Sequence, residues 1–362
     1  MAIDPKELLK LYEPKRQKKT FECENQQHTG ARFSPCGKYL IAGGCSGKVL
    51  RWDVATDEFK PLPVITGHGG NVTVAFGVGD GLVFTGDSWG RLRAWPYADE
   101  QPQNKWDIEQ AHDGWLRDLA VSPDGKLLAT CGRDKFLRVW DAATGKKLHE
   151  ISSTDDLFCV RWHPSGKYLV TGDHKGIAHQ WDLEQGKSIR QFDASALFAL
   201  FRLQDTGGIR SLAFDSAGKT LAVGGVKPGN SGNVQGMPTV MLFDWESGKL
   251  EKKIEITGDI FVQDIHFDSH GFIMLAINGN PGAGKLAYVH PDDPKPFFEA
   301  KLSNCHALSI HPDGKRMAVT MTNGNSSGNG RVKGKNGFRD YPANWSPVAL
   351  FDLPQEETAK TT

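Results

Sequence analysis

Residues 122–146, SPDGKLLATCGRDKFLRVWDAATGK, contain the pattern that decides the fold. The triplet PDG at 123–125 favours a turn, and the apolar run at 127–131 favours a short strand. A second turn at 132–134 precedes another apolar run, which ends at Trp140. The segment therefore predicts two short strands joined and flanked by tight turns.

Six further segments repeat this pattern. FSPCGKYLIAGGCSGKVLRWD begins at Phe33, and the other copies start near residues 77, 162, 214, 267 and 310. The turn glycines of the seven copies are Gly37, Gly81, Gly125, Gly166, Gly218, Gly271 and Gly314. Their successive spacings are 44, 44, 41, 52, 53 and 43 residues, which gives a period of about 43 with insertions near two copies. Seven repeats are the preferred count, and the spacing alone is also compatible with eight.

The second to fourth copies begin with Gly-His or Ala-His and end their third strand in Trp, and this pattern resembles the WD40 repeat family over residues 20–353. The resemblance implies an all-β, seven-bladed β-propeller. The fifth to seventh copies end instead in Phe243-Asp244, Tyr288-Val289 and Phe351-Asp352, so they depart from the signature. One four-stranded blade cannot bury both of its faces, so the blades must stack in a ring.

The first and last blades are expected to share a strand. The polar residues 353–362 after the seventh repeat offer no good fourth strand, whereas KKTFECE at 18–24 resembles the fourth strands of other blades. We therefore expect the amino-terminal segment to supply the last strand of blade seven. The predicted organisation is an amino-terminal helical appendage at 1–17, a propeller at 18–353 and a polar carboxyl-terminal tail at 354–362.

The resemblance also implies a hydrogen-bonded structural set within a blade. In blade three this set is His112, Thr130, Asp134 and Trp140. A buried indole, hydroxyl and imidazole must each find a partner, so structural bonding is preferred here over catalysis. No catalytic residue, metal ligand or cofactor is predicted.

Blades two and four keep part of this set. The retained residues are His68, Thr85, Trp95, Thr171 and Trp181. Where the pattern places the aspartate, blade two is expected to have Trp89 and blade four Lys175. Blade three is therefore predicted to be the most rigid.

Long connections between the second and third strands occur only in the later blades. They are expected at 224–238, 278–284 and 322–347, on the face where the chain enters each first strand, here called the top face. Long loops on a rigid scaffold are often functional, and disordered insertions are the alternative. The apolar segment 194–207 would, if helical, be buried, and burial within the chain is preferred over burial against a partner.

Candidate partner-binding residues follow from aligning the first strands. On the rim of the top face they are Trp115, Arg117, Phe158, Arg210, Phe261, Gln263 and His306. In the loop of blade seven they are Arg331, Lys333, Lys335, Phe338, Tyr341 and Trp345. Aromatic residues and arginine dominate binding energy at protein interfaces, so a protein or peptide partner is expected.

Composition narrows the other classes of function. Lys plus Arg equals Asp plus Glu at 43 each, so no global field drives binding to nucleic acid or to a membrane. The six cysteines are scattered without a CxxC pair, and the amino terminus has charges where a signal peptide needs an apolar core. We expect reduced thiols and a cytoplasmic location.

The sequence thus favours a non-catalytic scaffold or recognition module, a monomeric propeller that works within a complex. Its partner is expected to bind the top face near the long loops of blades five to seven. Two alternatives remain: a nucleic-acid or phospho-ligand module that uses the basic and aromatic loop 322–347, and a propeller enzyme with a site in the central channel.

Overall fold

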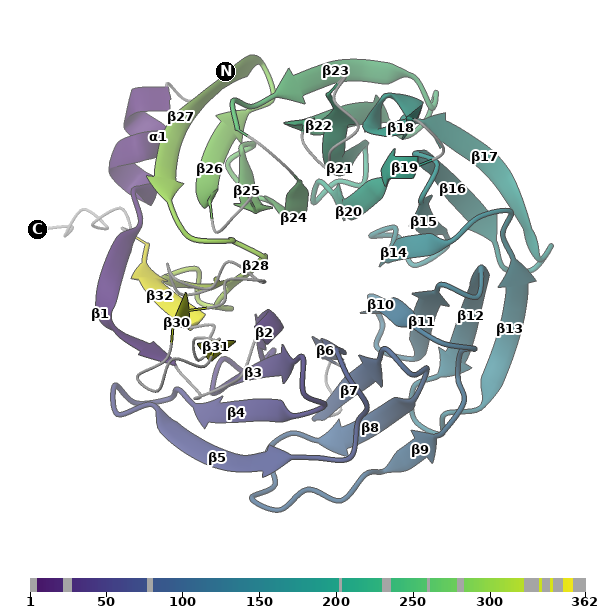
Figure 1. Cartoon of the computed structure of the whole chain (residues 1–362), viewed down its shortest axis with the longest axis vertical. Coiled ribbons are helices and arrows are strands. Elements are labelled where there is room, and N and C mark those ends of the chain that lie inside the picture. The colour runs from purple at the N-terminus through teal and green to yellow at the C-terminus, as the bar shows by residue number, and fades with distance from the viewer. Residues whose placement is uncertain are drawn as a thin grey trace, which may run out of the picture.

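The computed structural model describes residues 5–21, 28–76, 81–201, 204–229, 236–258, 261–278, 283–321, 332–333, 339–340 and 348–353. Within these residues, seven four-stranded antiparallel sheets form a closed ring around a central axis (Figure 1). The protein is therefore an all-β propeller with seven blades, as the repeat predicted.

Each blade runs from an inner strand at the axis to an outer strand at the circumference (Figure 1). Blade one contains β2 (His28–Phe33), β3 (Tyr39–Gly44), β4 (Val49–Asp53) and β5 (Lys60–Ile65). Blade two contains β6 (Val72–Phe76), β7 (Leu82–Asp87), β8 (Leu92–Pro96) and β9 (Trp106–Ile108). Blade three contains β10 (Leu116–Val121), β11 (Leu127–Gly132), β12 (Phe136–Asp141) and β13 (Lys147–Ser152). Blade four contains β14 (Leu157–Trp162), β15 (Leu169–Asp173), β16 (Ile177–Asp182) and β17 (Lys187–Asp193).

The later blades have the same order of strands. Blade five contains β20 (Ile209–Phe214), β21 (Thr220–Pro228), β22 (Gly236–Asp244) and β23 (Leu250–Glu255). Blade six contains β24 (Val262–Phe267), β25 (Ile273–Asn278), β26 (Gly284–His290) and β27 (Asp293–Lys301). Blade seven contains β28 (Ala307–Ile310), β29 (Arg316–Thr320), β32 (Val348–Asp352) and, as its outermost strand, β1 (Lys15–Phe21).

The sheet of blade seven joins the two ends of the chain. β1 pairs antiparallel with β32, with Lys15 opposite Asp352 and Phe21 opposite Val348. Because β1 begins at Lys15, the boundary expected at residue 18 falls inside a strand and is corrected to residue 15. The carboxyl-terminal residues 354–362 lie outside the described part of the chain.

The helix α1 (Pro5–Tyr12) packs on the outside of blade six (Figure 1). Leu8 is fully buried in an apolar cluster that includes Phe272 and Tyr288. The Tyr12 hydroxyl lies 2.9 Å from Nε2 of His270. A short helix is marginal by itself, so these contacts are what hold it.

The seven turn glycines share one backbone conformation. Their φ angles lie between 67° and 84°, a left-handed region that residues with a Cβ rarely adopt. Two of these turns also join neighbouring blades, because His163 Nε2 lies 2.9 Å from the carbonyl oxygen of Gly218 and His311 Nε2 lies 2.8 Å from that of Gly37. The second contact links blade seven to blade one.

The apolar segment 194–207 is not the helix that was considered. It forms a single 3₁₀ turn (Ser195–Leu197) and a hairpin of β18 (Phe198–Phe201) and β19 (Gln204–Gly207). Leu197 is fully buried against blade five, whereas Leu200 is 62% exposed. Gly207 has φ near 102°, which ends the hairpin and is incompatible with a helix at that residue.

The long connections of the later blades are partly strand. In blade five, β21 and β22 stay paired out to Pro228 opposite Gly236, so much of the loop expected at 224–238 is strand, and residues 230–235 lie outside the described residues. In blade seven only β30 (Val332–Lys333) and β31 (Arg339–Asp340) belong to the described residues, and they pair with each other. No helix in the described part of the chain is both long and apolar enough to cross a membrane.

Candidate functional site

The structural set of blade three forms a continuous hydrogen-bonded network. His112 Nδ1 lies 2.9 Å from Oδ1 of Asp134, and His112 Nε2 lies 2.8 Å from Oγ1 of Thr130. The Trp140 indole N–H donates to the same hydroxyl at 2.9 Å. Burial lowers the pKa of His112 despite the nearby Asp134, so this imidazole is neutral at neutral pH. The network holds β11 and β12 to the segment before β10.

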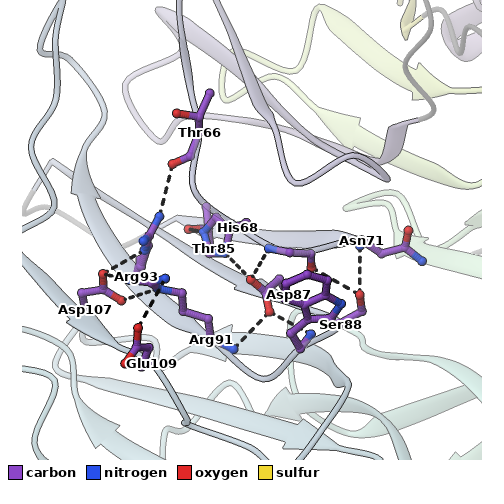
Figure 2. Close-up of polar contacts among 12 residues, drawn as sticks. Thr66, His68, Asn71, Thr85, Asp87, Ser88, Arg91, Arg93, Asp107 and Glu109 are labelled. Carbon is purple, nitrogen blue, oxygen red and sulfur yellow. Dashed lines mark hydrogen bonds and ion pairs between the residues drawn. The ribbon is translucent and has the colours of Figure 1, made fainter.

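Blade two contains an equivalent network, and the aspartate is Asp87 rather than a residue at position 89 (Figure 2). His68 Nδ1 lies 2.8 Å from Asp87 Oδ2, and Trp95 donates to Thr85 at 2.8 Å. The expectation that Trp89 takes the place of the aspartate is therefore wrong. Trp89 is instead 75% exposed on the top face.

Blade four also has an aspartate in its network. Asp173 Oδ2 lies 3.1 Å from Nε2 of His179, and the Trp181 indole donates to Thr171 at 2.7 Å. Lys175 does not occupy this position, because its ammonium pairs with Asp205 at 2.7 Å. In blades two and four the aspartate follows the threonine by two residues in a Thr-Gly-Asp triplet, and in blade three by four. That triplet was the signal in the sequence.

A cavity of about 450 Å³ lies on the axis of the ring at its top face, and we call it the channel mouth. All seven inner strands or the residues just before them contribute to its lining. Six of the predicted rim residues line it, namely Trp115, Arg117, Phe158, Arg210, Gln263 and His306. The structure thus brings together, on one cavity, residues from blades three to seven.

Five residues of the rim form an alternating row of aromatic rings and guanidinium groups. The row consists of Trp115, Arg117, Phe158, Arg210 and Phe261. The guanidinium carbon of Arg117 lies 3.9 Å from the centroid of the Trp115 ring and 4.7 Å from that of Phe158. The guanidinium carbon of Arg210 lies 4.2 Å from the Phe158 ring and 4.7 Å from that of Phe261. We call these five residues the arginine–aromatic row; it spans blades three to six.

Two ion pairs cross between blades below this row. Arg32 of blade one pairs with Asp264 of blade six at 3.0 Å, and Arg161 of blade four pairs with Asp118 of blade three at 2.6 Å. Burial opposes the charge on Arg161, but the two carboxylates outweigh it and raise its pKa. These four residues were missed in the sequence. Both aspartates lie seven residues before a turn glycine, and both arginines lie five residues before one. This shared spacing was the signal in the sequence that could have identified them.

The remaining predicted residues belong to the loop of blade seven. Lys333 lies in β30, where only the backbone is described. Arg331, Lys335, Phe338, Tyr341 and Trp345 lie outside the described residues. The part of the chain with described side chains contains no group of three or more His, Cys, Asp or Glu placed to hold a metal ion.

Comparison with known proteins agrees with the fold. The WD domain, G-beta repeat family matches residues 15–53, 105–141 and 145–182. Mouse telomerase protein component 1 is 29% identical over 222 residues, which cover 61% of this chain and 7% of that protein. The target of rapamycin complex subunit wat1 of Schizosaccharomyces pombe is 26% identical over 48% of this chain and 55% of its own length. The small ribosomal subunit protein RACK1z of Arabidopsis thaliana is 38% identical over 22% of this chain and 23% of its own length.

Seven four-stranded blades and the three matched repeats define the class of protein: the chain is a seven-bladed β-propeller that contains WD40 repeats. The matched segments span about half of the yeast relative and much less of the other two. The shared part is therefore the repeat, and the activities of the whole relatives do not transfer with it.

Proposed function

We propose that this protein is a non-catalytic scaffold or recognition module that binds a partner protein or peptide over the channel mouth. The observation that carries the proposal is the arginine–aromatic row, because aromatic and arginine side chains supply most of the binding energy at interfaces. The rigid ring holds this row in place before any partner arrives, which lowers the entropy cost of binding.

Exposed apolar side chains on the same face support the proposal. Trp89 is 75% exposed in the turn between β7 and β8, and Leu200 is 62% exposed on the hairpin that precedes β20. Both connections emerge at the end of the blades where the inner strands begin. A partner that covers the channel mouth could bury them as well.

The names of two relatives support a role within an assembly. One is a subunit of the target of rapamycin complex and another is a small ribosomal subunit protein. By analogy, this chain would act as one propeller within a larger complex, with a cytoplasmic location. Imaging of the tagged protein in its native cell tests the location, and a purely nuclear or membrane signal would contradict it.

The channel offers little support for an enzyme. Two carboxylates, Asp118 and Asp264, line the described channel mouth, and each is bound to an arginine. A carboxylate held in an ion pair has its lone pairs engaged by the arginine, which makes it a poor general base.

Affinity purification of the tagged chain from its native cell, after chemical cross-linking, tests the proposal. Trp115→Ala should lose the partners that the unmodified chain recovers. The matched control is Leu148→Ser, which removes a side chain that is 42% exposed on the outer strand β13. If Trp115→Ala folds normally and recovers the same partners at the same yield, the top-face proposal is wrong.

A further inference from the structure

The channel mouth carries an excess of positive charge although the chain as a whole is neutral. Four arginines and two aspartates line it, so the balance there is four minus two, or two positive charges. Arg32 and Arg161 are neutralised by Asp264 and Asp118. Arg117 and Arg210 are therefore the source of the excess.

Neither of these two arginines forms an ion pair with any described residue. The Nε atoms of Arg117 and Arg210 are buried and have no hydrogen-bond partner among the described residues. One hydrogen bond of Arg210 is present, from Nη2 to the carbonyl oxygen of Gly207 at 3.1 Å. Buried polar groups are normally paired, so two such groups at one cavity need an explanation.

The neighbours of each guanidinium group are aromatic rings rather than carboxylates. Arg117 lies over the rings of Trp115 and Phe158, and Arg210 lies over those of Phe158 and Phe261. An aromatic ring supplies no carboxylate oxygen, so these contacts leave the N–H groups of both guanidinium groups without an ion-pair partner among the described residues. The aromatic rings also restrict the rotation of both side chains. Two oriented sets of donors therefore border the same cavity.

Burial lowers the pKa of both guanidinium groups but leaves them charged at neutral pH. It lowers the pKa of Arg210 to about 10, with Arg117 adding repulsion. It also lowers the pKa of Arg117, against an attraction from Asp156. Both groups remain cationic at neutral pH, and an anion placed between them would relieve the mutual repulsion.

We propose that the channel mouth recognises an oxyanion, a carboxylate or a phosphate, carried on an extended segment of the partner and bound by the edges of Arg117 and Arg210. This inference rests on the proposed function, since it names the chemistry of the segment that docks there. A cavity of about 450 Å³ admits a side-chain head group but no folded domain. Gln263 and Thr73 line the same cavity and add neutral polar groups beside the anion.

Three fluorescein-labelled peptides test the proposal by fluorescence anisotropy with the full chain. They share a flexible glycine and serine sequence and differ in a central pair of residues, which is glutamate, phosphoserine or glutamine. The glutamate or phosphoserine peptide should bind and the glutamine peptide should not. Tighter binding of one anionic peptide identifies a carboxylate or a phosphate as the source. Equal binding of all three, or no binding of either anionic peptide, overturns the proposal.

Variants of the two arginines locate the site. Arg117→Met and Arg210→Met should each weaken binding at least about tenfold, since charge-assisted hydrogen bonds are lost. Arg210→Lys keeps the charge but not the planar edge, so it should give an intermediate affinity and serves if the methionine variant does not fold. Arg133→Gln, a matched control, removes an exposed top-face charge that repels Arg117 but does not line the channel mouth, and it should change binding less than about twofold.

Two outcomes separate this inference from the proposed function. If Arg133→Gln weakens peptide binding as much as Arg210→Met does, the attraction is diffuse and the oxyanion site is wrong. If the glutamate, phosphoserine and glutamine peptides bind equally well while Trp115→Ala still loses its cellular partners, the top face remains the docking surface. Only the proposed recognition of an oxyanion is then wrong.

Discussion

The network of blade three and the channel mouth are built from the same kinds of side chain, but they differ in how their charges are paired. In the network, Arg138 pairs with Asp134 at 2.6 Å and with Glu150 at 2.7 Å. At the channel mouth, Arg210 forms no ion pair with a described residue and lies between aromatic rings. Paired groups stabilise the fold, whereas unpaired donors are available for a ligand.

The largest expected effect is on the stability of a blade network. Thr130→Val keeps the side-chain volume but leaves the Trp140 indole and His112 Nε2 without a partner, so it should lower the free energy of unfolding by about 2–4 kcal/mol. Thr171→Val removes one such bond, from Trp181, and should cost about half as much. Urea denaturation measures both. Equal losses would contradict the view that the number of orphaned groups sets the cost.

The next largest loss of stability is expected where a substitution removes an arginine that forms an ion pair. Arg161→Met leaves the partly buried Asp118 without its arginine and should cost about 2–3 kcal/mol of stability. Arg117→Met removes a charge that has no paired carboxylate among the described residues, and it should change stability by less than about 1 kcal/mol. The two variants remove the same group from the same cavity. If chemical denaturation gives them equal losses, the distinction between paired and unpaired arginines fails.

Acid should weaken the fold through histidines that are fully or partly buried in the neutral form. Burial lowers the pKa of His306 to about 4 and also lowers that of His112. The unfolded chain binds these protons near pH 6.5, so the stability is complete above that pH and declines as pH falls towards 4. His306→Gln should therefore reduce the fall in melting temperature between these values. His149→Gln, on the outer strand β13, is the control and should leave the fall unchanged.

The carboxylates act in a lower pH range. Burial favours the neutral form of Asp134, but hydrogen bonds from His112 and Arg138 outweigh it and hold its pKa well below the usual range. Its contribution is therefore present above the ordinary carboxyl pKa and is lost only below it. The contradicting outcome for the histidine prediction is a melting temperature that falls as steeply with acid in His306→Gln as in the unmodified chain. That result would show that the His306 imidazole does not cause the loss of stability above pH 4.

The smallest stability effect is expected at Trp89. Its side chain is 75% exposed, so Trp89→Ser should change the free energy of unfolding by less than about 0.5 kcal/mol. The ring lies so close to Gly69 that a Cβ added there would overlap it. Gly69→Ala should therefore displace the indole while keeping it in the protein. If partner capture falls in both variants at unchanged melting temperature, Trp89 belongs to the interface; unchanged capture in both excludes it.

Some parts of the site followed directly from the repeat. Strands pair at nearly constant intervals, so aligning the turn glycines put Arg117 and Arg210 at the same height in their blades. Which neighbours they contact depends on the angle between blades, and that angle is set by side-chain packing across the whole ring. The stacking of both arginines on Phe158 was therefore not predictable from spacing.

The error at blade two has a local physical cause. Residues two and four positions after the threonine both flank the turn between the second and third strands. Either side chain can therefore reach the histidine, as Asp87 does in one blade and Asp134 in another. A pattern with one allowed position for the aspartate assigned Trp89 to the network, although it is exposed.

The sequence by itself determined the repeat, the number of strands in a blade and the residues that point to the top of each inner strand, because these depend on local turns and on the alternation of side chains along a strand. Only the tertiary structure decided which charges are paired. Arg161 meets Asp118 and Arg32 meets Asp264 across blade boundaries, between residues far apart in the chain. Arg117 and Arg210 are left as donors at the channel mouth because the ring brings aromatic rings to them, where a carboxylate would have neutralised their charge.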